Sequence, residues 1–257
     1  MPNLKPNTFP RVSVIMPVFN HEQFLAESIV SVLQQTMEDF EFIIVDDASD
    51  DKCPEIIALY ASFDDRIKHH TLPVNMGQAH ATNYGAKFAK GEYMAWHHSD
   101  DNYHPEFLEK LLATGADVAY SAFAQFTIDG EVTRYGTDLD NFTFDLERFK
   151  SKCYLSCQVM IYKRSIFEEL GGYDDSFETC TDWDFSLRAC QAARTVELVP
   201  EVLGYYREWH PQANRRRISE SIRNDNRRRI RQKYGVDDTD VESIEREENL
   251  KKESNAD

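Results

Sequence analysis

Long apolar runs are missing from this chain of 257 residues. It has no uninterrupted stretch of about 18 apolar residues, so the sequence predicts no helix that spans a bilayer. The opening residues, 1–7, carry no apolar core of the kind found in signal peptides. We therefore expect a cytoplasmic protein without a transmembrane segment.

Two phosphate-binding loops are also missing. No Gly-x-Gly-x-x-Gly follows the first apolar run, and no Gly-x-x-x-x-Gly-Lys-Ser/Thr occurs anywhere. Their absence disfavours dinucleotide-dependent redox chemistry and P-loop phosphate hydrolysis. The formal net charge of −16 argues against nucleic acid as a partner. A phosphate held without these loops usually needs a metal ion, for which carboxylates are suitable ligands.

The chain has few cysteines, and their positions do not suggest a metal site or a set of disulfides. The five cysteines are an odd number and lack two close pairs of the zinc-binding kind; they are Cys53, Cys153, Cys157, Cys180 and Cys190. Free thiols in a reducing compartment are the expected state.

What the chain does contain is an alternation of short apolar runs and amphipathic segments. Strands are predicted at 11–16, 40–45, 66–71, 93–96 and 117–123, and helices at 21–36, 53–62, 78–89 and 105–113. This alternation predicts an α/β fold with a mostly parallel sheet flanked by helices.

The pattern changes after about residue 124, where a mixed region is predicted. A hairpin is expected around Asp129-Gly130, then strands at 155–162, 196–199 and 202–206, and helices at 164–170, 181–193 and 217–234. We predict a single domain over 1–235, with a nucleotide-binding half (10–123) and an acceptor-side half (124–235) that completes the active site and receives the second substrate. Residues 236–257 are strongly acidic and are expected to be disordered.

An arginine-rich stretch precedes this tail, at residues 215–231. Two interpretations stay open. The stretch forms an amphipathic helix with a solvated basic face, or it docks to an anionic surface such as phospholipid headgroups, giving peripheral membrane contact.

Acidic residues mark three ends of predicted elements. Asp46-Asp47 and Asp100-Asp101 each follow an apolar strand, and parallel strands bring such ends to one edge of a sheet. Adjacent carboxylates repel each other, so a nearby cation such as Mg²⁺ or Mn²⁺ would stabilise them. At the third point, Asp182 either caps the following helix or leaves that task to Thr181 and is available for chemistry.

Several sequence blocks occur in a characteristic order. They are Val12-Ser-Val-Ile-Met-Pro-Val-Phe-Asn20, Phe40-Glu-Phe-Ile-Ile-Val-Asp-Asp-Ala-Ser-Asp50, Asn75-Met-Gly77 with Asn83, His98-Ser-Asp-Asp-Asn102, Leu170-Gly-Gly-Tyr-Asp174, Thr181-Asp-Trp-Asp184 and Tyr206-Arg-Glu-Trp-His210. Over residues 10–215 this ordered set resembles the family 2 glycosyltransferases, which have the GT-A fold. The nearest type is the one associated with spore-coat polysaccharide.

The resemblance implies a metal-dependent inverting transfer of a sugar from a nucleoside diphosphate sugar, with UDP as the expected nucleotide. The acceptor would be a hydroxyl of a glycan, a polysaccharide or a lipid-linked molecule. Asp182 matches the general base. The implied donor-binding residues are Pro17, Phe19, Asn20, Asp47, Asn75, Gly77, His98 and Asp100, with Asp47 on the nucleotide base. The implied ligands of Mn²⁺ or Mg²⁺ are Asp100, Asp101 and His210.

Three positions depart from the family pattern. His98 stands where many members have the first acid of Asp-x-Asp, Thr82 replaces a frequent Arg, and Thr181 replaces the usual Glu before the base. His98 could ligate a metal or hydrogen-bond a ribose, or it could be a structural residue at a strand end. These departures leave a second hypothesis open, a non-catalytic module that binds nucleotide sugars.

Overall fold

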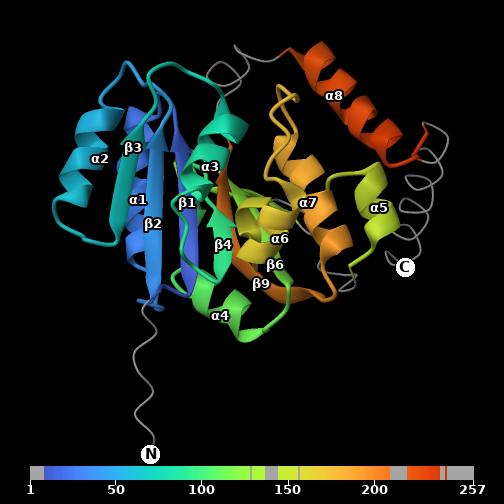
Figure 1. Cartoon of the computed structure of the whole chain (residues 1–257), viewed down its shortest axis with the longest axis horizontal. Helices are drawn as coiled ribbons and strands as arrows, with labels where there is room; N and C mark the ends of the chain where they lie inside the picture. Colours follow the sequence, from blue (N-terminus) through green and yellow to red (C-terminus); the bar gives the residue numbers. More distant parts are fainter. Residues whose placement is uncertain are drawn as a thin grey trace, which may run out of the picture.

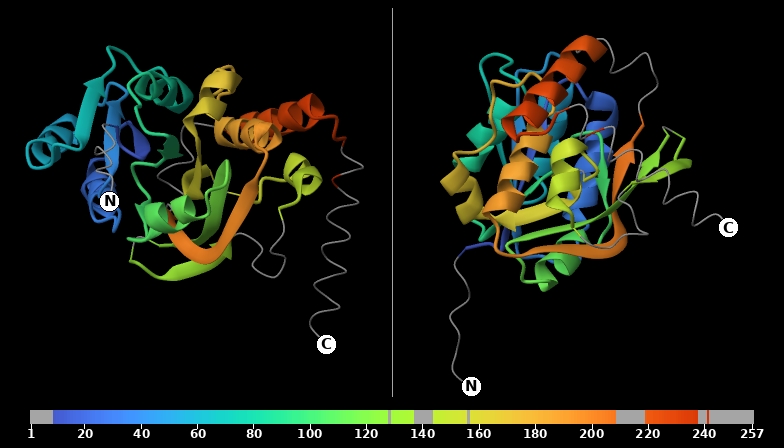
Figure 2. Two further views of the ribbon diagram at one scale, coloured as in Figure 1. Left: turned by 60° about the horizontal axis from the view of Figure 1, so that its bottom comes forward. Right: turned by 90° about the vertical axis from the view of Figure 1, so that its right-hand side faces the viewer.

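The structure is a computed structural model that describes residues 9–127, 129–136, 144–155, 157–208, 219–237 and 241. Nine strands of this part of the chain form one curled sheet (Figures 1 and 2), in the order β3-β2-β1-β4-β8-β6-β9-β5 with β7 beside β6. The two predicted halves therefore share a sheet.

The first half of the chain forms the parallel side of this sheet. Strand β1 pairs in parallel with β2 and β4, and β2 pairs in parallel with β3. Its elements in chain order are β1 (Val12–Val18), α1 (Glu22–Leu33), β2 (Phe40–Asp46), α2 (Cys53–Ala61), β3 (Ile67–Thr71), α3 (Gln78–Ala86), β4 (Tyr93–Trp96), β5 (Asn102–Tyr103) and α4 (Phe107–Ala113). The strand–helix alternation predicted from the sequence is confirmed here.

The second half adds strands in both directions. Strand β8 is antiparallel to β4 and to β6, whereas β9 is parallel to β6. Its elements are β6 (Val118–Phe126), β7 (Val132–Gly136), α5 (Leu146–Ser151), the 3₁₀ helix η1 (Cys157–Val159), β8 (Met160–Lys163), α6 (Arg164–Leu170), α7 (Thr181–Ala192), β9 (Val196–Arg207) and α8 (Glu220–Lys233). The predicted hairpin is present as β6–β7.

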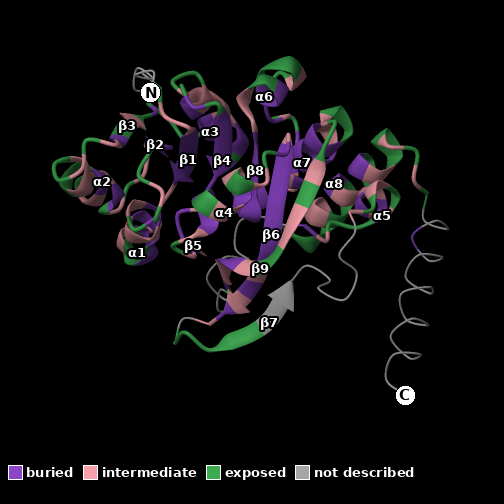
Figure 3. Ribbon diagram, turned by 90° about the horizontal axis from the view of Figure 1, so that it is seen from below, coloured by how far each residue is buried: buried purple, intermediate pink, exposed green. Residues whose placement is uncertain are grey.

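Two apolar layers cover the faces of the sheet, because side chains of a strand alternate between them. Ile15, Ile43 and Val45 pack in the layer that also holds residues of α3, α6 and α7. Val14 and Phe42 pack in the other layer, with residues of α1, α2 and α4. Figure 3 shows that strands such as β1, β4 and β6 are largely buried, whereas much of β9 is intermediate or exposed.

Several details differ from the sequence-based expectations, among them helix α5, which was not predicted. The strand expected at 155–162 begins as η1 and becomes extended only at Met160, and the short strand β5 was not predicted. The two strands expected at 196–199 and 202–206 are one strand, β9. Its register slips between Val199, opposite Ser121, and Val202, opposite Ala122. Pro200 lies within this irregularity, where its missing N–H costs no ladder hydrogen bond.

Among the described residues, no helix is both long enough and apolar enough to cross a membrane. His210, the arginines at 215–217 and nearly all of the acidic stretch 236–257 lie outside the described residues. The predictions made for them stay predictions.

Candidate functional site

The carboxyl edge of the parallel strands carries the first pair of aspartates. Asp46 is the last residue of β2 and pairs with Val18, the last residue of β1. Asp46 accepts a hydrogen bond from the Ser49 amide, at 3.1 Å, so its side chain stabilises the turn that follows. Asp47, the first residue after β2, is also buried.

Asp47 is oriented by backbone donors from another loop. Its two carboxylate oxygens accept the amides of Met76 and Gly77, each at 2.8 Å. Burial raises the pKa of Asp47, and these two hydrogen bonds offset part of that effect. Gly77 has a φ of 89°, a left-handed conformation that favours glycine, and it directly precedes α3. The structure thus brings Asp47 beside Gly77, with exposed Asn75 two residues before it.

The other predicted donor-side residues of the first block are at the end of β1. Pro17 lies inside β1, and Phe19 and Asn20 follow it. The Asn20 amide donates to the Asp50 carboxylate at 2.5 Å and its oxygen accepts the Asp50 amide at 2.9 Å. The side chain of Asn20 therefore fastens the turn after β2, a structural role that the sequence motif alone did not reveal.

A turn that follows β4 carries the second pair of aspartates. Asp100 and Asp101 are both buried, and Nδ1 of His98 lies 3.2 Å from Oδ2 of Asp101. His98, Asp100 and Asp101 each offer one possible ligand atom, and these three atoms lie within 4.8 Å of one another. Burial lowers the pKa of His98, but the hydrogen bond and charge of Asp101 outweigh it and raise the pKa. Burial and the charge of Asp100 raise the pKa of Asp101.

This turn fits a divalent ion. The donor set is two carboxylates and one imidazole, which suits Mn²⁺. Nε2 of His98 is buried and has no hydrogen-bond partner within the described part of the chain. A buried polar atom without a partner is costly, and a ligand would remove that cost. His98, Asp100 and Asp101 are therefore the residues that would hold the ion.

Helix α1 fixes the turn from one side. The Ser28 hydroxyl contacts the carbonyl oxygens of Asp101 and of His98. His21 Nδ1 lies 2.7 Å from the Ser99 hydroxyl. The turn is thus tied to the helix that follows β1 and does not depend on its own short loop for its shape.

Asp182 lies in the first turn of α7. The residue at the N-cap position is Cys180, with a left-handed φ of 62° and no side-chain capping bond. The expectation that Asp182 or Thr181 caps the helix is therefore wrong, since both residues already belong to α7. Asp182 is half-buried, and Oδ2 of its carboxylate lies 3.7 Å from the Cys157 thiol.

Asp182 also lies near the other acidic groups. Its charge, with those of Asp100 and Asp101, acts on His98 and on the Tyr206 hydroxyl. Burial raises the pKa of Tyr206, and the three carboxylates raise it further. The aspartate of α7 and the aspartates that follow β4 are therefore close enough to His98 and Tyr206 to act on both electrostatically.

Asp184, two residues further along α7, has a different environment. Its buried carboxylate accepts from Arg188 Nε at 2.8 Å, from Lys233 Nζ at 2.6 Å and from the Tyr234 hydroxyl at 3.2 Å. It thereby joins α7 to α8. The neighbouring Trp183 is buried and donates its Nε1–H to the Phe149 carbonyl, so it belongs to the core.

Sequence reasoning gave no role to three residues that the structure places beside the predicted site. They are Cys157, Tyr206 and Arg207. Tyr206 and Arg207 lie inside a quoted block, which was a usable signal. No sequence signal pointed to Cys157, because its contact with Asp182 joins segments that are 25 residues apart.

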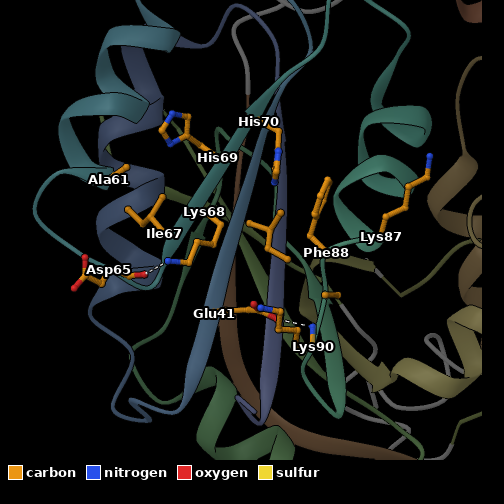
Figure 4. A pocket seen from close by; sticks show the side chains of 12 residues that line it. Glu41, Ala61, Asp65, Ile67, Lys68, His69, His70, Lys87, Phe88 and Lys90 are labelled. Atoms are coloured by element: carbon orange, nitrogen blue, oxygen red, sulfur yellow. Dashed lines mark hydrogen bonds between the residues drawn. The ribbon is translucent and has the colours of Figure 1, made fainter. Parts of the chain in front are cut away.

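A cavity of about 640 Å³ lies elsewhere, around the edge strand β3 (Figure 4). Glu41 and Lys90 lie at one end of it, and the Phe88 ring stacks on His70. Glu41 is near the amino end of β2, whereas Asp46 and Asp47 follow its carboxyl end. The cavity contains none of the predicted site residues.

The sheet and its acidic edge define an α/β protein of the GT-A class. The family description "Glycosyl transferase family 2" matches residues 13–171, more than half of the chain. The chain belongs to this family, which confirms the resemblance inferred from the sequence blocks.

Two relatives come from Bacillus subtilis (strain 168). The chain is 31% identical over 219 residues to the glycosyltransferase EpsH, covering 77% of this chain and 61% of EpsH. It is 37% identical over 136 residues to the teichuronic acid biosynthesis glycosyltransferase TuaG, covering 53% of each. The chain thus spans less than two thirds of the length of these relatives.

Solved structures show the same fold. S. aureus TarS 1–349 in complex with UDP-GlcNAc superposes with a TM-score of 0.66 at 22% identity, covering 78% of this chain and 59% of that one. The mannosyltransferase PcManGT from Pyrobaculum calidifontis, in complex with GDP-Man and Mn²⁺, gives a TM-score of 0.60 at 21% identity, covering 81% and 59%.

Proposed function

We propose that this protein is a metal-dependent, inverting glycosyltransferase that uses a nucleoside diphosphate sugar, with UDP as the expected nucleotide. The acceptor is a hydroxyl group of a glycan, a polysaccharide or a lipid-linked molecule. The observation that carries the proposal is the cluster of His98, Asp100 and Asp101, with Asp182 close enough for its charge to act on His98. The nucleotide-sugar complexes of TarS and PcManGT, which share the fold, support the donor class.

The roles follow from position. The Asp47 edge, with Gly77 beside it, receives the nucleoside, and the turn that follows β4 receives the diphosphate. A divalent ion bound by His98, Asp100 and Asp101 would neutralise charge on the leaving diphosphate.

Asp182 takes the proton from the acceptor hydroxyl while the acceptor oxygen forms a bond to the anomeric carbon. The bond from that carbon to the diphosphate oxygen breaks on the opposite face. One displacement needs one base, so a single carboxylate in this position suffices for inversion.

A transfer assay tests the proposal directly. Purified protein is incubated with a panel of UDP- and GDP-sugars, with and without Mn²⁺, and released nucleoside diphosphate is measured. We expect release that depends on Mn²⁺ and that is lost in Asp182→Asn. Release that persists in Asp182→Asn would remove this residue from the role of base, and release without any divalent ion would refute the metal requirement.

A second candidate function, a non-catalytic module that binds nucleotide sugars, is favoured by one observation. His98 Nδ1 lies 3.2 Å from Asp101 Oδ2, so the imidazole already occupies an oxygen that a metal would use. Calorimetry that shows nucleotide binding, together with no turnover across the donor panel, would select this candidate.

Peripheral membrane contact through residues 215–231 is also part of the proposal. Within α8, Arg231 donates to the Ser151 carbonyl and the Arg229 guanidinium lies 4.6 Å from the Phe177 ring centre, so both are engaged by the domain. Arg227 and Arg228 pair only loosely, at 3.6 and 3.5 Å, with the exposed side chains of Glu220 and Asp225 on the same helix, and are the better candidates for lipid contact. Liposome sedimentation of Arg227→Gln/Arg228→Gln tests this; binding to anionic vesicles equal to wild type would end the idea.

A further inference from the structure

Arg207 is a buried arginine at the carboxyl end of β9. Only 4% of its surface is exposed. Its guanidinium carbon lies 4.7 Å from the centre of the Phe24 ring and 4.5 Å from that of Phe126. A cation between two aromatic rings is held in place by electrostatic attraction to both ring faces.

Residue 207 makes two contacts with the turn that follows β4. Its main-chain amide donates to Asp101 Oδ1 at 2.7 Å, and its side-chain Nε donates to the Asp100 carbonyl at 2.8 Å. The first bond fixes a carboxylate oxygen of one candidate metal ligand. The second fixes the peptide between the two candidate ligands, and so the direction in which both side chains leave the turn.

The far end of the guanidinium is anchored to α1. Nη2 donates to Glu27 Oε2 at 2.7 Å, and Oε1 of Glu27 accepts from the Asn102 amide at 2.5 Å. Glu27, Arg207 and Asn102 thus enclose the turn between helix α1 and strand β9. Since Glu27 is 57% exposed along its side chain, the anchor is reachable from solvent, whereas the contact with the turn is buried.

The contacts require the shape of arginine. A planar guanidinium can donate to Asp100 along one edge and to Glu27 along another, while its faces meet two rings. A lysine ammonium is a single point and cannot reach both oxygens from between the rings. Arg207 contacts the turn through its main-chain amide and its Nε, and its ion pair is with Glu27.

We propose that Arg207 is the positioning residue of the metal-binding turn: it orients Asp100 and Asp101 through main-chain contacts without touching metal or donor. This inference rests on the metal site of the proposed function. It assigns to the last strand of the acceptor-side half the task of shaping the ion site of the donor-side half.

The test compares Mn²⁺ affinity with nucleoside affinity. Calorimetry measures binding of Mn²⁺ alone, and separately of the nucleoside, uridine or guanosine, that the wild-type chain binds. Residues that support metal ligands typically change metal affinity by about 10- to 100-fold when replaced. We expect Arg207→Lys and Arg207→Met to weaken Mn²⁺ binding by about that range and to leave nucleoside affinity within about twofold.

Arg164 provides a matched control, because its Nε also donates to a carbonyl, that of Gly91, at 2.8 Å, and its guanidinium also pairs with a glutamate, Glu168. Arg164→Lys and Arg164→Met should leave both affinities unchanged. Glu27→Gln removes the anchor while keeping Arg207 in place, so it provides a milder variant should Arg207→Met fail to fold. It should weaken Mn²⁺ binding less than Arg207→Lys does.

The outcomes separate the two claims. Mn²⁺ binding equal to wild type in Arg207→Lys and in Glu27→Gln would overturn the role of Arg207 and leave the proposed function intact. An equal loss of Mn²⁺ and nucleoside affinity would show a general structural role and would also overturn it. A wild-type chain that binds nucleoside but no Mn²⁺ would overturn the metal site, and this inference with it.

Discussion

Helix α7 carries two aspartates in different surroundings. Asp182 belongs to the candidate site, and Asp184 lies at the interface between α7 and α8. Asp184 is fully buried and bonded to Arg188, Lys233 and Tyr234. Asp182, two residues earlier, meets only the weakly donating Cys157 thiol as a hydrogen-bond partner among the described residues. The two carboxylates therefore differ both in burial and in their partners, because Asp182 is half-buried and only Asp184 has cationic partners among the described hydrogen bonds.

The same contrast holds for pKa values across the molecule. The pKa of Asp64 is lowered, chiefly by its hydrogen bonds with the Arg66 side chain. The pKa values of Asp47 and Asp101 are raised by burial, and their described hydrogen-bond donors include backbone amides but no Lys or Arg side chain. Asp47 is therefore suited to receive a polar ligand from outside, whereas Asp101 also has the His98 imidazole 3.2 Å from its carboxylate.

The largest expected effect is on the reaction and comes from Asp182→Asn. Loss of a general base typically lowers the rate by about 10²- to 10⁴-fold. The substitution keeps the shape and leaves no cation without a partner, so the free energy of unfolding should change by less than about 1 kcal/mol. Steady-state transfer assays and urea unfolding check both parts. A large loss of stability would indicate that Asp182 has a structural role like that of Asp184.

Asp184→Asn should show the reverse pattern. Breaking a buried ion pair typically costs about 3–5 kcal/mol because the partner charge stays behind. Lys233 is 38% exposed and can turn to water, so we expect a value near the lower end. Urea unfolding measures the loss, and kcat per folded molecule should stay within a few-fold of wild type. A fall in kcat like that of Asp182→Asn would erase the distinction between the two.

Asp47→Asn should weaken nucleoside binding. The carboxylate accepts two loop amides, whereas an asparagine offers one oxygen, so either Met76 or Gly77 loses its acceptor. A hydrogen bond to a charged group contributes about 1.5–3 kcal/mol, and 1.4 kcal/mol is tenfold in affinity, so we expect a loss of about tenfold or more. Calorimetry with the preferred nucleoside checks this. Asp65→Asn, at an exposed aspartate before β3, is the control.

Cys157→Ala should have a small effect that is confined to turnover. Burial and the charge of Asp182 raise the pKa of the Cys157 thiol, so it stays protonated and can donate to the carboxylate. Removing one weak donor should lower kcat by about two- to fivefold, the scale of a neutral hydrogen bond, with donor KM unchanged. Cys190→Ala, a buried thiol in the same apolar layer, serves for comparison. An equal loss of kcat there would deny Cys157 a specific role.

Asp64→Asn should cost stability in a pH-dependent way. Arg66 donates to the Asp64 carboxylate from Nη2 at 2.7 Å and from Nε at 3.0 Å, which contributes about 1 kcal/mol at a partly exposed site. Because the pKa of Asp64 is lowered on folding, this contribution is present above the unfolded value near 4 and disappears as the pH falls below it. Unfolding at pH 7 and pH 3 checks the sign. A difference that grows at low pH would be wrong for a lowered pKa.

Sequence patterns predicted the parallel half of the fold well and the mixed half less well. A strand such as Tyr93–Trp96 is recognisable because its apolar run is buried on both faces, independent of its partners. Strand β9 was divided in two because Pro200 ends a local pattern, and only the register slip beside β6 shows why the strand continues.

The candidate site could likewise be predicted from the sequence only where its pattern is local. The aspartates after β2 and β4 could be placed at one edge because parallel strands share polarity. The contacts of Cys157 with Asp182 and of Arg207 with Asp101 join residues that are 25 and 106 positions apart. Such contacts depend on packing between distant segments, and no local pattern encodes them.

The position of Arg207 in the chain also bears on synthesis. Asp100 and Asp101 leave the ribosome long before the residue that holds them, since 106 positions separate Asp101 from Arg207. Domains generally fold as units during synthesis. A nascent chain stopped before β9 already carries the acidic turn but lacks the bonds from Arg207. The turn acquires its full set of supports only when the last strand has been made.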